Sequence, residues 1–196
     1  CKSMQINSKK TDLILDGGNI TLCGNRIVMT DKIFKENHKE KSDVAFIKLL
    51  EDFFGHEIVI IPWHCINPDD KYADVFGHSD GFIHWCGGNQ VLMSNHRDVD
   101  SEEAKRIREI MESYGYQVTE MLYDVEVPES DWNWAYINYL QVGKKIIIPS
   151  FGIPEDKQAL TYVKRANPDC EVRQIRMRDI AANGGALHCI TWNIRH

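Results

Sequence analysis

Short apolar runs follow glycine turns at three places along the chain. They are GNRIVMTDKIF from Gly24, GNQVLMSNHRD from Gly88 and GKKIIIPSFGI from Gly143. Runs of Ile, Val, Leu and Met bounded by turn residues are typical of β-strands. The pattern therefore predicts three strands at equivalent positions of a repeated unit.

A helical pattern follows each of these strands. The predicted helices occupy residues 44–54, 101–114 and 155–165. In the second, apolar residues recur at the i, i+3, i+4, i+7 spacing between Ile107 and Tyr114, and Ser101 is the predicted N-cap. This spacing indicates amphipathic helices with one buried face.

Two further strands complete each unit. ILDGGNITLC, DGFIHWC and AYINYLQV precede the three turns, and GHEIVIIP, GYQVTEML and CEVRQIRM follow the three helices. The repeat is thus β-β-α-β, which predicts a mixed α/β fold. ALHCITW, residues 186–192, is predicted to be the first strand of a fourth unit. Because such modules are stabilised by their neighbours, we expect the array to close into a ring or to be part of a longer one.

The composition narrows the functional classes. A chain of 196 residues with 43% hydrophobic and 27% charged residues predicts one globular domain spanning residues 1–196. A net charge of -6 argues against a nucleic-acid or anionic-membrane partner, because both need concentrated positive charge. No apolar run approaches the roughly 18 to 20 residues needed to span a bilayer.

Cysteine usage predicts a cellular compartment. The six cysteines form no C-x-x-C pair and are too dilute for a disulfide scaffold, which favours a reducing, cytoplasmic location. Cys1 leaves an alternative open. If it is the residue left after lipoprotein processing, the protein is exported or lipid-anchored.

Polar residues recur near the start of each first strand. Asp16 lies eight positions before Gly24, and Asp80 lies eight positions before Gly88, with His78 two residues further back. If the modules pack around an axis, these strand starts meet at one end of it.

Two more polar residues occupy similar positions in the repeated unit. They are Asn138, ahead of the third turn, and Cys189, in the last predicted strand. Each candidate has a structural alternative. Asp16 could cap a turn, His78 could be a surface histidine, Asn138 could satisfy strand backbone, and Cys189 could be a small core residue.

A thiol, an imidazole and two carboxylates favour one kind of chemistry. The thiolate is a nucleophile, and a histidine can carry its proton. Carboxylates suit a cation, and a guanidinium presents a planar donor fork that matches them. The set therefore favours a cationic guanidine substrate over a peptide bond, which weakens a cysteine-protease interpretation.

Four motifs carry a resemblance to a known family. LDGGN at 15–19, GHSDG at 77–81, AYINYLQVGKKIIIP at 135–149 and NGGALHCIT at 183–191 resemble the agmatine deiminase and bacterial-type peptidylarginine deiminase family of guanidine-modifying enzymes. The resemblance spans nearly the whole chain in the right order. It implies a pentein-type α/β propeller with five-fold pseudosymmetry, of which this chain holds about three modules plus a strand.

The resemblance also implies roles for the candidate residues. Cys189 would attack the guanidinium carbon, and His78 would protonate the departing ammonia and then activate water against a covalent thiouronium. Asp80 would hold guanidinium nitrogens, Asp16 would orient His78 or the substrate, and Asn138 would line the site. The substrate would be agmatine, arginine or peptidyl-arginine, the products a urea and ammonia, and no cofactor or metal is implied.

The chain departs from the family in one respect. Family members carry an earlier R-D motif whose aspartate supplies a second guanidinium contact, and nothing before Asp16 matches it. We therefore expect the chain to be the carboxy-terminal portion of a longer enzyme or a reduced relative, weakly active or inactive alone. Homo-oligomer formation is a further expectation.

Three alternatives remain open. An amidinotransferase of the same fold would pass the amidino group to an amine instead of water. An incomplete propeller would act as a binding domain without catalysis. A zinc site would need the pairs His64-Cys65, His84 with Cys86, or His188-Cys189, and none has a standard ligand spacing.

Overall fold

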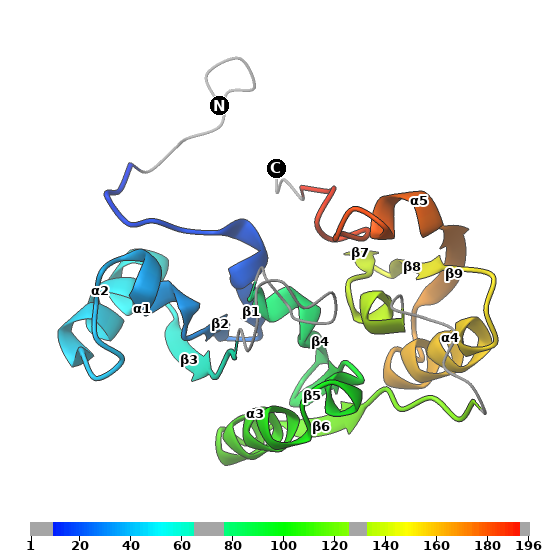
Figure 1. The fold of residues 1–196 in the computed structure, drawn as a ribbon, viewed down its shortest axis with the longest axis horizontal. Helices are drawn as coiled ribbons and strands as arrows, with labels where there is room; N and C mark the ends of the chain where they lie inside the picture. Colours follow the sequence, from blue (N-terminus) through cyan, green and yellow to red (C-terminus); the bar gives the residue numbers. More distant parts are fainter. Residues whose placement is uncertain (1–9, 65–76, 126–132, 193–196) are drawn as a thin grey trace.

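The computed structural model describes residues 10–64, 77–125 and 133–192. The predicted Cys1 and Cys65 features lie outside these residues. The described chain forms three modules that follow one another, with helices α2, α3 and α4 on the outside and strands β1 and β4 towards the middle (Figure 1). The predicted mixed α/β fold and its β-β-α-β repeat are confirmed.

Each module holds a three-stranded sheet. The first module has β1 (Thr21–Cys23), β2 (Arg26–Thr30), α1 (Lys32–Glu36), α2 (Val44–Phe54) and β3 (Glu57–Ile61). The second has β4 (Ile83–Gly87), β5 (Gln90–Met93), α3 (Ser101–Ser113) and β6 (Gln117–Glu120). The third has β7 (Leu140–Val142), β8 (Lys145–Ser150), α4 (Glu155–Ala166), β9 (Glu171–Arg176) and α5 (Arg178–Ala181).

The strands pair in the same way in every module. The first and second strands form an antiparallel hairpin, and the third strand lies parallel to the second. The hairpin glycines Gly24, Gly88 and Gly143 have φ angles of 68°, 53° and 58°. This left-handed backbone favours glycine, which explains why the glycine turns mark the repeat.

Hydrophobic contacts join each module to the next. In the first sheet, Ile27 and Ile58 pack with α2, whereas Val59 and Ile61 belong to the core cluster that contains Ile107 of α3. Leu92 and Met121 of the second module join the third module's core in the same way. Both faces of a sheet are therefore used, one by its own helix and one by the following module.

The helices begin and end at recognisable caps. Asp43 caps α2 by accepting a hydrogen bond from the Phe46 backbone N–H, and Gly55 ends it with a φ of 70°. The predicted Ser101 cap is wrong, because Asp100 accepts from the Glu103 backbone N–H and Ser101 is the first helical residue. An aspartate immediately before a predicted serine cap can take its place.

The first strand of each module is shorter than predicted. A 3-10 turn takes up the preceding residues, as η2 (Gly17–Asn19), η3 (Ser79–Gly81) and η5 (Asn133–Ile137). A fourth such turn, η4 (His96–Asp98), leads into α3. The short helix α1 was not predicted, because five residues are too few to show a helical period.

The predicted strand at residues 186–192 is wrong. These residues form turns, in which the Thr191 backbone N–H donates to the His188 carbonyl and the Thr191 hydroxyl donates to the Leu187 carbonyl. A strand needs a neighbour to bond with, and within the described residues this segment instead donates the His188 N–H to the Asn138 carbonyl. Cys189 therefore lies in a turn.

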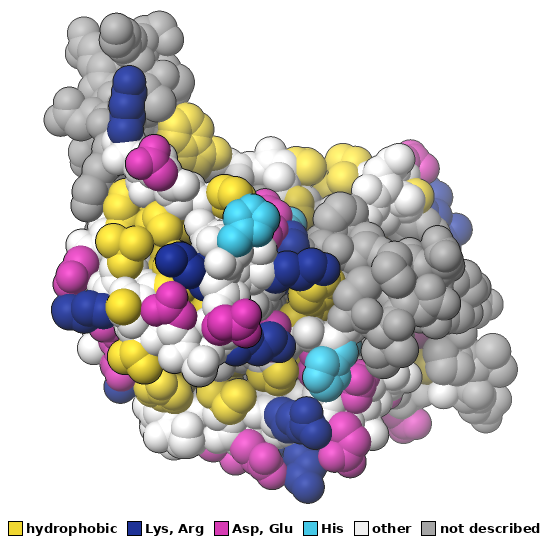
Figure 2. All heavy atoms as spheres, turned by 60° about the vertical axis from the view of Figure 1, so that its left-hand side comes forward, with side chains coloured by type: hydrophobic (Ala, Val, Ile, Leu, Met, Phe, Trp, Pro, Cys, Tyr) yellow, Lys and Arg dark blue, Asp and Glu magenta, His cyan; other side chains and the backbone are white. Residues whose placement is uncertain are grey.

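The surface carries mixed charge on the face that Figure 2 shows. Lys and Arg side chains lie interspersed with Asp and Glu side chains there. None of the helices described in the structure combines the length and apolar character needed to cross a membrane.

Candidate active site

The three turns that precede the first strands bring the candidate residues together. Turn η3 contacts both η2 and η5. Asp16 immediately precedes η2, His78 precedes η3, Asp80 lies within η3, and Asn138 follows η5. The structure thus gathers polar side chains from three modules at one place.

His78 and Asp16 form a direct pair across two modules. The His78 Nε2 and the Asp16 Oδ2 are 2.7 Å apart. The Lys32 ammonium donates to the same Asp16 oxygen at 3.1 Å. Partial burial acts to raise the pKa of the Asp16 carboxyl, but the hydrogen bonds from His78 and Lys32 outweigh it and lower that pKa. Asp16 is therefore ionised at neutral pH.

Gly18 provides the space that the His78 ring occupies. A Cβ atom added at Gly18 would lie 2.4 Å from the His78 Nδ1, well inside contact distance. The glycine pair in the LDGGN motif therefore has a steric role next to the imidazole as well as a turn-forming one.

Asp80 is a buried carboxylate at the centre of the site. Only 5% of the residue is exposed. Its Oδ2 lies 2.8 Å from the His188 Nδ1 and 3.9 Å from the Cys189 Sγ. His78 immediately precedes η3 and Asp80 lies within it, so this segment carries both the His78–Asp16 pair and the carboxylate that faces the thiol.

Asn138 holds the turn that carries the thiol. Its side-chain oxygen accepts a hydrogen bond from the Cys189 backbone N–H at 3.2 Å, and its carbonyl accepts from the His188 N–H at 3.1 Å. Its amide nitrogen lies 3.5 Å from the Asp80 carbonyl. Asn138 is 1% exposed, so its amide joins η3 to the Cys189 turn from within the protein.

The environment of Cys189 disfavours its thiolate. Burial of the sulfur is the largest cause that raises the pKa of the Cys189 thiol, and the nearby Asp80 charge also raises it, against a hydrogen bond from the Ala186 backbone. The thiol is therefore protonated at neutral pH, and a cation placed beside Asp80 would favour its ionisation.

Sequence reasoning missed two residues of the site, His188 and Lys32. His188 had a usable signal, because it directly precedes Cys189 and so could reach the same carboxylate. Lys32 had none, because only the fold brings α1 next to Asp16.

The equal spacing of Asp16 and Asp80 from their turn glycines is not a structural equivalence. Asp16 precedes η2 as His78 precedes η3, while Asp80 lies two residues later. Strand β4 is longer than β1, and its register shifts between Trp85 and Gly87. Residues at equivalent places in the two modules therefore lie at different distances in sequence from their turn glycines. Both acids nevertheless lie at turns that contact each other, η2 and η3.

A group of potential metal ligands among the described residues does not include Cys189. His64, Asp100 and Glu103 present ligand atoms within 4.8 Å of one another. Glu103 already accepts hydrogen bonds from the His64 backbone N–H and the His96 ring. His84, one member of the zinc pairs considered above, stacks on Tyr139 with ring centroids 3.6 Å apart, and burial lowers its pKa to about 3.

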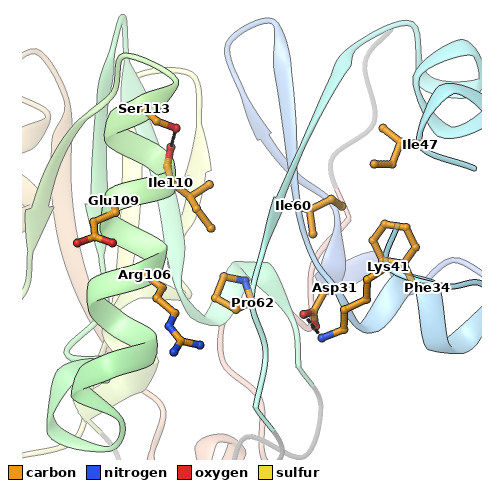
Figure 3. Close-up of a pocket in the computed structure, with 10 residues that line it drawn as sticks. All are labelled: Asp31, Phe34, Lys41, Ile47, Ile60, Pro62, Arg106, Glu109, Ile110 and Ser113. Atoms are coloured by element: carbon orange, nitrogen blue, oxygen red, sulfur yellow. Dashed lines mark hydrogen bonds and ion pairs between the residues drawn. The ribbon is translucent and has the colours of Figure 1, made fainter. Parts of the chain in front are cut away.

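An open groove lies between the first two modules (Figure 3). Ile110 and Arg106 of α3 face Ile60 and Pro62 across it, and Phe34 and Lys41 lie on its far side. None of the cluster residues around Cys189 is among those that line it. The groove is therefore a feature of the module junction, distinct from the candidate site.

Comparisons with known proteins agree on one family. The model of the Porphyromonas-type peptidyl-arginine deiminase family matches residues 1–194. Agmatine deiminase of Pseudomonas aeruginosa strain LESB58 is 27% identical over 213 residues, covering 92% of this chain and 56% of the relative. The chain therefore spans about half the length of this curated relative.

Solved structures share the fold. A C. jejuni agmatine deiminase superposes with a TM-score of 0.75 at 20% identity, over 96% of this chain and 57% of that one. An amidinotransferase of saxitoxin biosynthesis from Microseira wollei superposes with a TM-score of 0.58 at 16% identity, over 92% and 47%. The architecture is thus common to both reaction types.

Proposed function

The chain belongs to the Porphyromonas-type peptidyl-arginine deiminase family, and from this premise we propose that its site serves the hydrolytic deimination of a guanidinium group. The proposal rests on one observation, that the Cys189 sulfur lies 3.9 Å from a carboxylate oxygen of Asp80. A planar cation held at Asp80 would present its carbon to the sulfur. The name of the Pseudomonas relative makes agmatine a first candidate substrate.

In the first step, a bound guanidinium offsets the Asp80 charge and promotes ionisation of the Cys189 thiol. The thiolate attacks the guanidinium carbon and forms a C–S bond. His78 takes the thiol proton and passes it to the departing nitrogen as one C–N bond breaks, so that this group leaves as ammonia. The product of this step is a thiouronium on Cys189, and the carbon has exchanged one nitrogen for sulfur.

In the second step, His78 removes a proton from water as the water oxygen attacks the thiouronium carbon. The C–S bond breaks, the sulfur leaves as a thiol, and a urea is released. The overall change consumes one water and yields one ammonia. Asp16 supports the charged form of His78 during both transfers because its ionised oxygen lies 2.7 Å from the ring.

Asn138 and Asp80 complete the proposed assignments. Asn138 keeps the Cys189 backbone fixed against η3, and Asp80 binds the guanidinium nitrogens. A small cationic guanidine or an arginine side chain is the partner that this charge arrangement favours.

Covalent labelling tests this proposal. We expect 2-chloroacetamidine, a guanidinium mimic with a leaving group, to alkylate Cys189 in the full chain, as read by peptide mass spectrometry. Agmatine, arginine and an arginine-containing peptide are added separately as protectants, and the one that blocks labelling identifies the substrate. Cys170→Ser is the matched control and should label as the wild type does, whereas Cys189→Ser should not.

Labelling spread over several cysteines, with no protection by any guanidine, would contradict the proposal. Incubation with a guanidine and an acceptor amine separates the amidinotransferase alternative. A guanidinylated amine in place of a urea would assign the site to that reaction.

A further inference from the structure

The cluster of His64, Asp100 and Glu103 lies where the first two modules meet. His64 is the third residue after β3, and Asp100 and Glu103 are the N-cap and the third residue of α3. The His64 Nδ1 lies 3.5 Å from the Asp100 Oδ2 and 3.8 Å from the Glu103 Oε1. One imidazole from the first module thus faces two carboxylates from the second.

These separations are close to those between the ligands of a single ion. Metal–ligand bonds of about 2.0 to 2.2 Å place two tetrahedral ligands roughly 3.3 to 3.6 Å apart. We propose that His64, Asp100 and Glu103 bind one divalent first-row transition-metal ion. An imidazole nitrogen together with carboxylate oxygens is a donor set that such ions accept.

The other contacts of the two carboxylates leave ligand positions open. The Asp100 Oδ1 caps α3 by accepting from the Glu103 backbone N–H, whereas its Oδ2 faces His64. The same backbone hydrogen bond is the largest cause that lowers the pKa of the Asp100 carboxyl. The Glu103 Oε1 accepts from the His64 backbone N–H at 2.6 Å. Since a carboxylate oxygen has two lone pairs, Oε1 keeps one for an ion.

The charge of Glu103 gives a second, independent reason to expect a cation. Its side chain is 1% exposed, and a buried carboxylate is costly unless it is paired. In the part of the chain that the structure describes, its ion-pair partners are His64 and His96, and neither is a lysine or an arginine. A divalent ion would supply the permanent positive charge.

The surroundings suit both entry and retention of an ion. The His64 side chain is 40% exposed, so an ion can reach the cluster from solvent, and the Asp100 side chain is 16% exposed. The His96 Nε2 lies against the Glu103 Oε2, the oxygen that does not face His64. Hydrogen bonds of this kind orient ligating carboxylates in metal sites. A bound ion would tie the end of the first module to the start of α3.

Binding of Mn²⁺ to the chelator-treated full chain tests the proposal, with free Mn²⁺ read by electron paramagnetic resonance. Mn²⁺ is the probe because thiolates, which compete for softer ions such as Zn²⁺, bind it poorly. We expect one saturable site in the wild type. His64→Ala and Asp100→Asn should each weaken it by about tenfold or more. Asp100→Asn keeps a capping oxygen and so retains the start of α3.

His56→Ala and Asp52→Asn are the matched controls and should bind Mn²⁺ as the wild type does. His56 contacts the Phe54 carbonyl, and Asp52 forms an exposed ion pair with Lys48. Mn²⁺ should also raise the thermal unfolding midpoint of the wild type and of both controls, because it binds only the folded chain.

An absence of saturable Mn²⁺ binding to the wild type would overturn the proposal. Wild-type affinity in either His64→Ala or Asp100→Asn would overturn it as well, because each variant removes one proposed ligand. Neither readout involves turnover, so the result does not depend on the proposed deimination.

Discussion

At the residue scale, the side chain of Asp80 joins turn η3 to the turn that carries Cys189. Its Oδ2 faces both the His188 ring and the Cys189 sulfur. It accepts a hydrogen bond from His188, and its charge adds to burial in raising the pKa of the Cys189 thiol. A guanidinium bound to this carboxylate would neutralise its charge, so that the charge would no longer raise the pKa of the Cys189 thiol. Ionisation of the thiol would then depend on bound substrate.

Asp80→Asn should therefore lower the pKa of the Cys189 thiol, because one of the causes that raise it is a negative charge. The pH dependence of alkylation by neutral iodoacetamide, followed from pH 6 to pH 10, should shift to lower pH. Asp98→Asn, a change to an acid outside the cluster, serves as the control. A shift to higher pH would contradict this account of the thiol.

Gly18→Ala should displace the His78 ring, since the new Cβ would overlap its Nδ1 at 2.4 Å. We expect loss of the His78–Asp16 contact, seen as changed chemical shifts of the His78 ring protons, with the fold retained. Gly17→Ala is the control, because a Cβ there meets nothing within 4 Å. Indistinguishable His78 ring resonances in the two variants would show that Gly18 has no steric role.

Residue chemistry could be predicted from sequence more fully than residue contacts. Asp16, His78, Asp80, Asn138 and Cys189 were all singled out because similar polar residues recur near equivalent turns. Lys32 could not be, because no periodicity relates α1 to the residue before η2. The sequence does not reveal the bulge in β4 either. Asp16 and Asp80, which lie at equal distances from their turn glycines, were therefore wrongly taken as equivalent positions of the repeat.

At the element scale, the third module positions Asn138 through its neighbours. Asp156 at the start of α4 accepts hydrogen bonds from the Tyr136 hydroxyl at 2.6 Å and from the backbone N–H groups of residues 151–153. Tyr136 lies in η5, two residues before Asn138. The helix start therefore fixes the turn that in turn holds Cys189.

Asp156→Ala should destabilise the chain by about 2 to 4 kcal/mol, since four donors, three of them in partly buried hydrogen bonds, lose their acceptor at about 1 kcal/mol each. Denaturant unfolding measures the change. Asp52→Ala removes an acid whose ion pair with Lys48 is exposed, and should cost less than about 1 kcal/mol. Similar losses for both variants would mean that Asp156 contributes no more than a surface acid.

The elements themselves were predictable where the apolar period was long enough. The helix predicted over 44–54 matches α2, and those over 101–114 and 155–165 match α3 and α4 to within one residue. The 3-10 turns before the first strands were not predictable, because three to five residues are too few to show a helical period. The last segment was predicted as a strand because ALHCITW is apolar, but pairing depends on neighbours that a local pattern does not contain.

At the scale of the whole molecule, the modules share their cores. Leu92 of β5 is fully buried in the cluster that also contains Ile148 and Val163 of the third module. Such contacts make the stability of one module depend on the next. The candidate site depends on this coupling, because its residues come from three modules.

Leu92→Ala should cost about 2 to 5 kcal/mol by removing buried methyl groups and leaving a cavity. Because the cores are shared, we expect the denaturant transition to shift as a single step for both tryptophan fluorescence and circular dichroism. Leu22→Ala, at a position that is 50% exposed, should change stability little. Separate transitions for the two probes would show that the modules unfold independently.

The central claim is that Cys189 and Asp80 meet around a guanidinium. A crystal structure of the Cys189→Ser variant with bound agmatine tests it most directly. The account predicts a guanidinium nitrogen within hydrogen-bond distance of an Asp80 oxygen, and the guanidinium carbon about 3 to 3.5 Å from the serine hydroxyl. Agmatine bound elsewhere, with Asp80 still paired to His188 and free of the ligand, would contradict it.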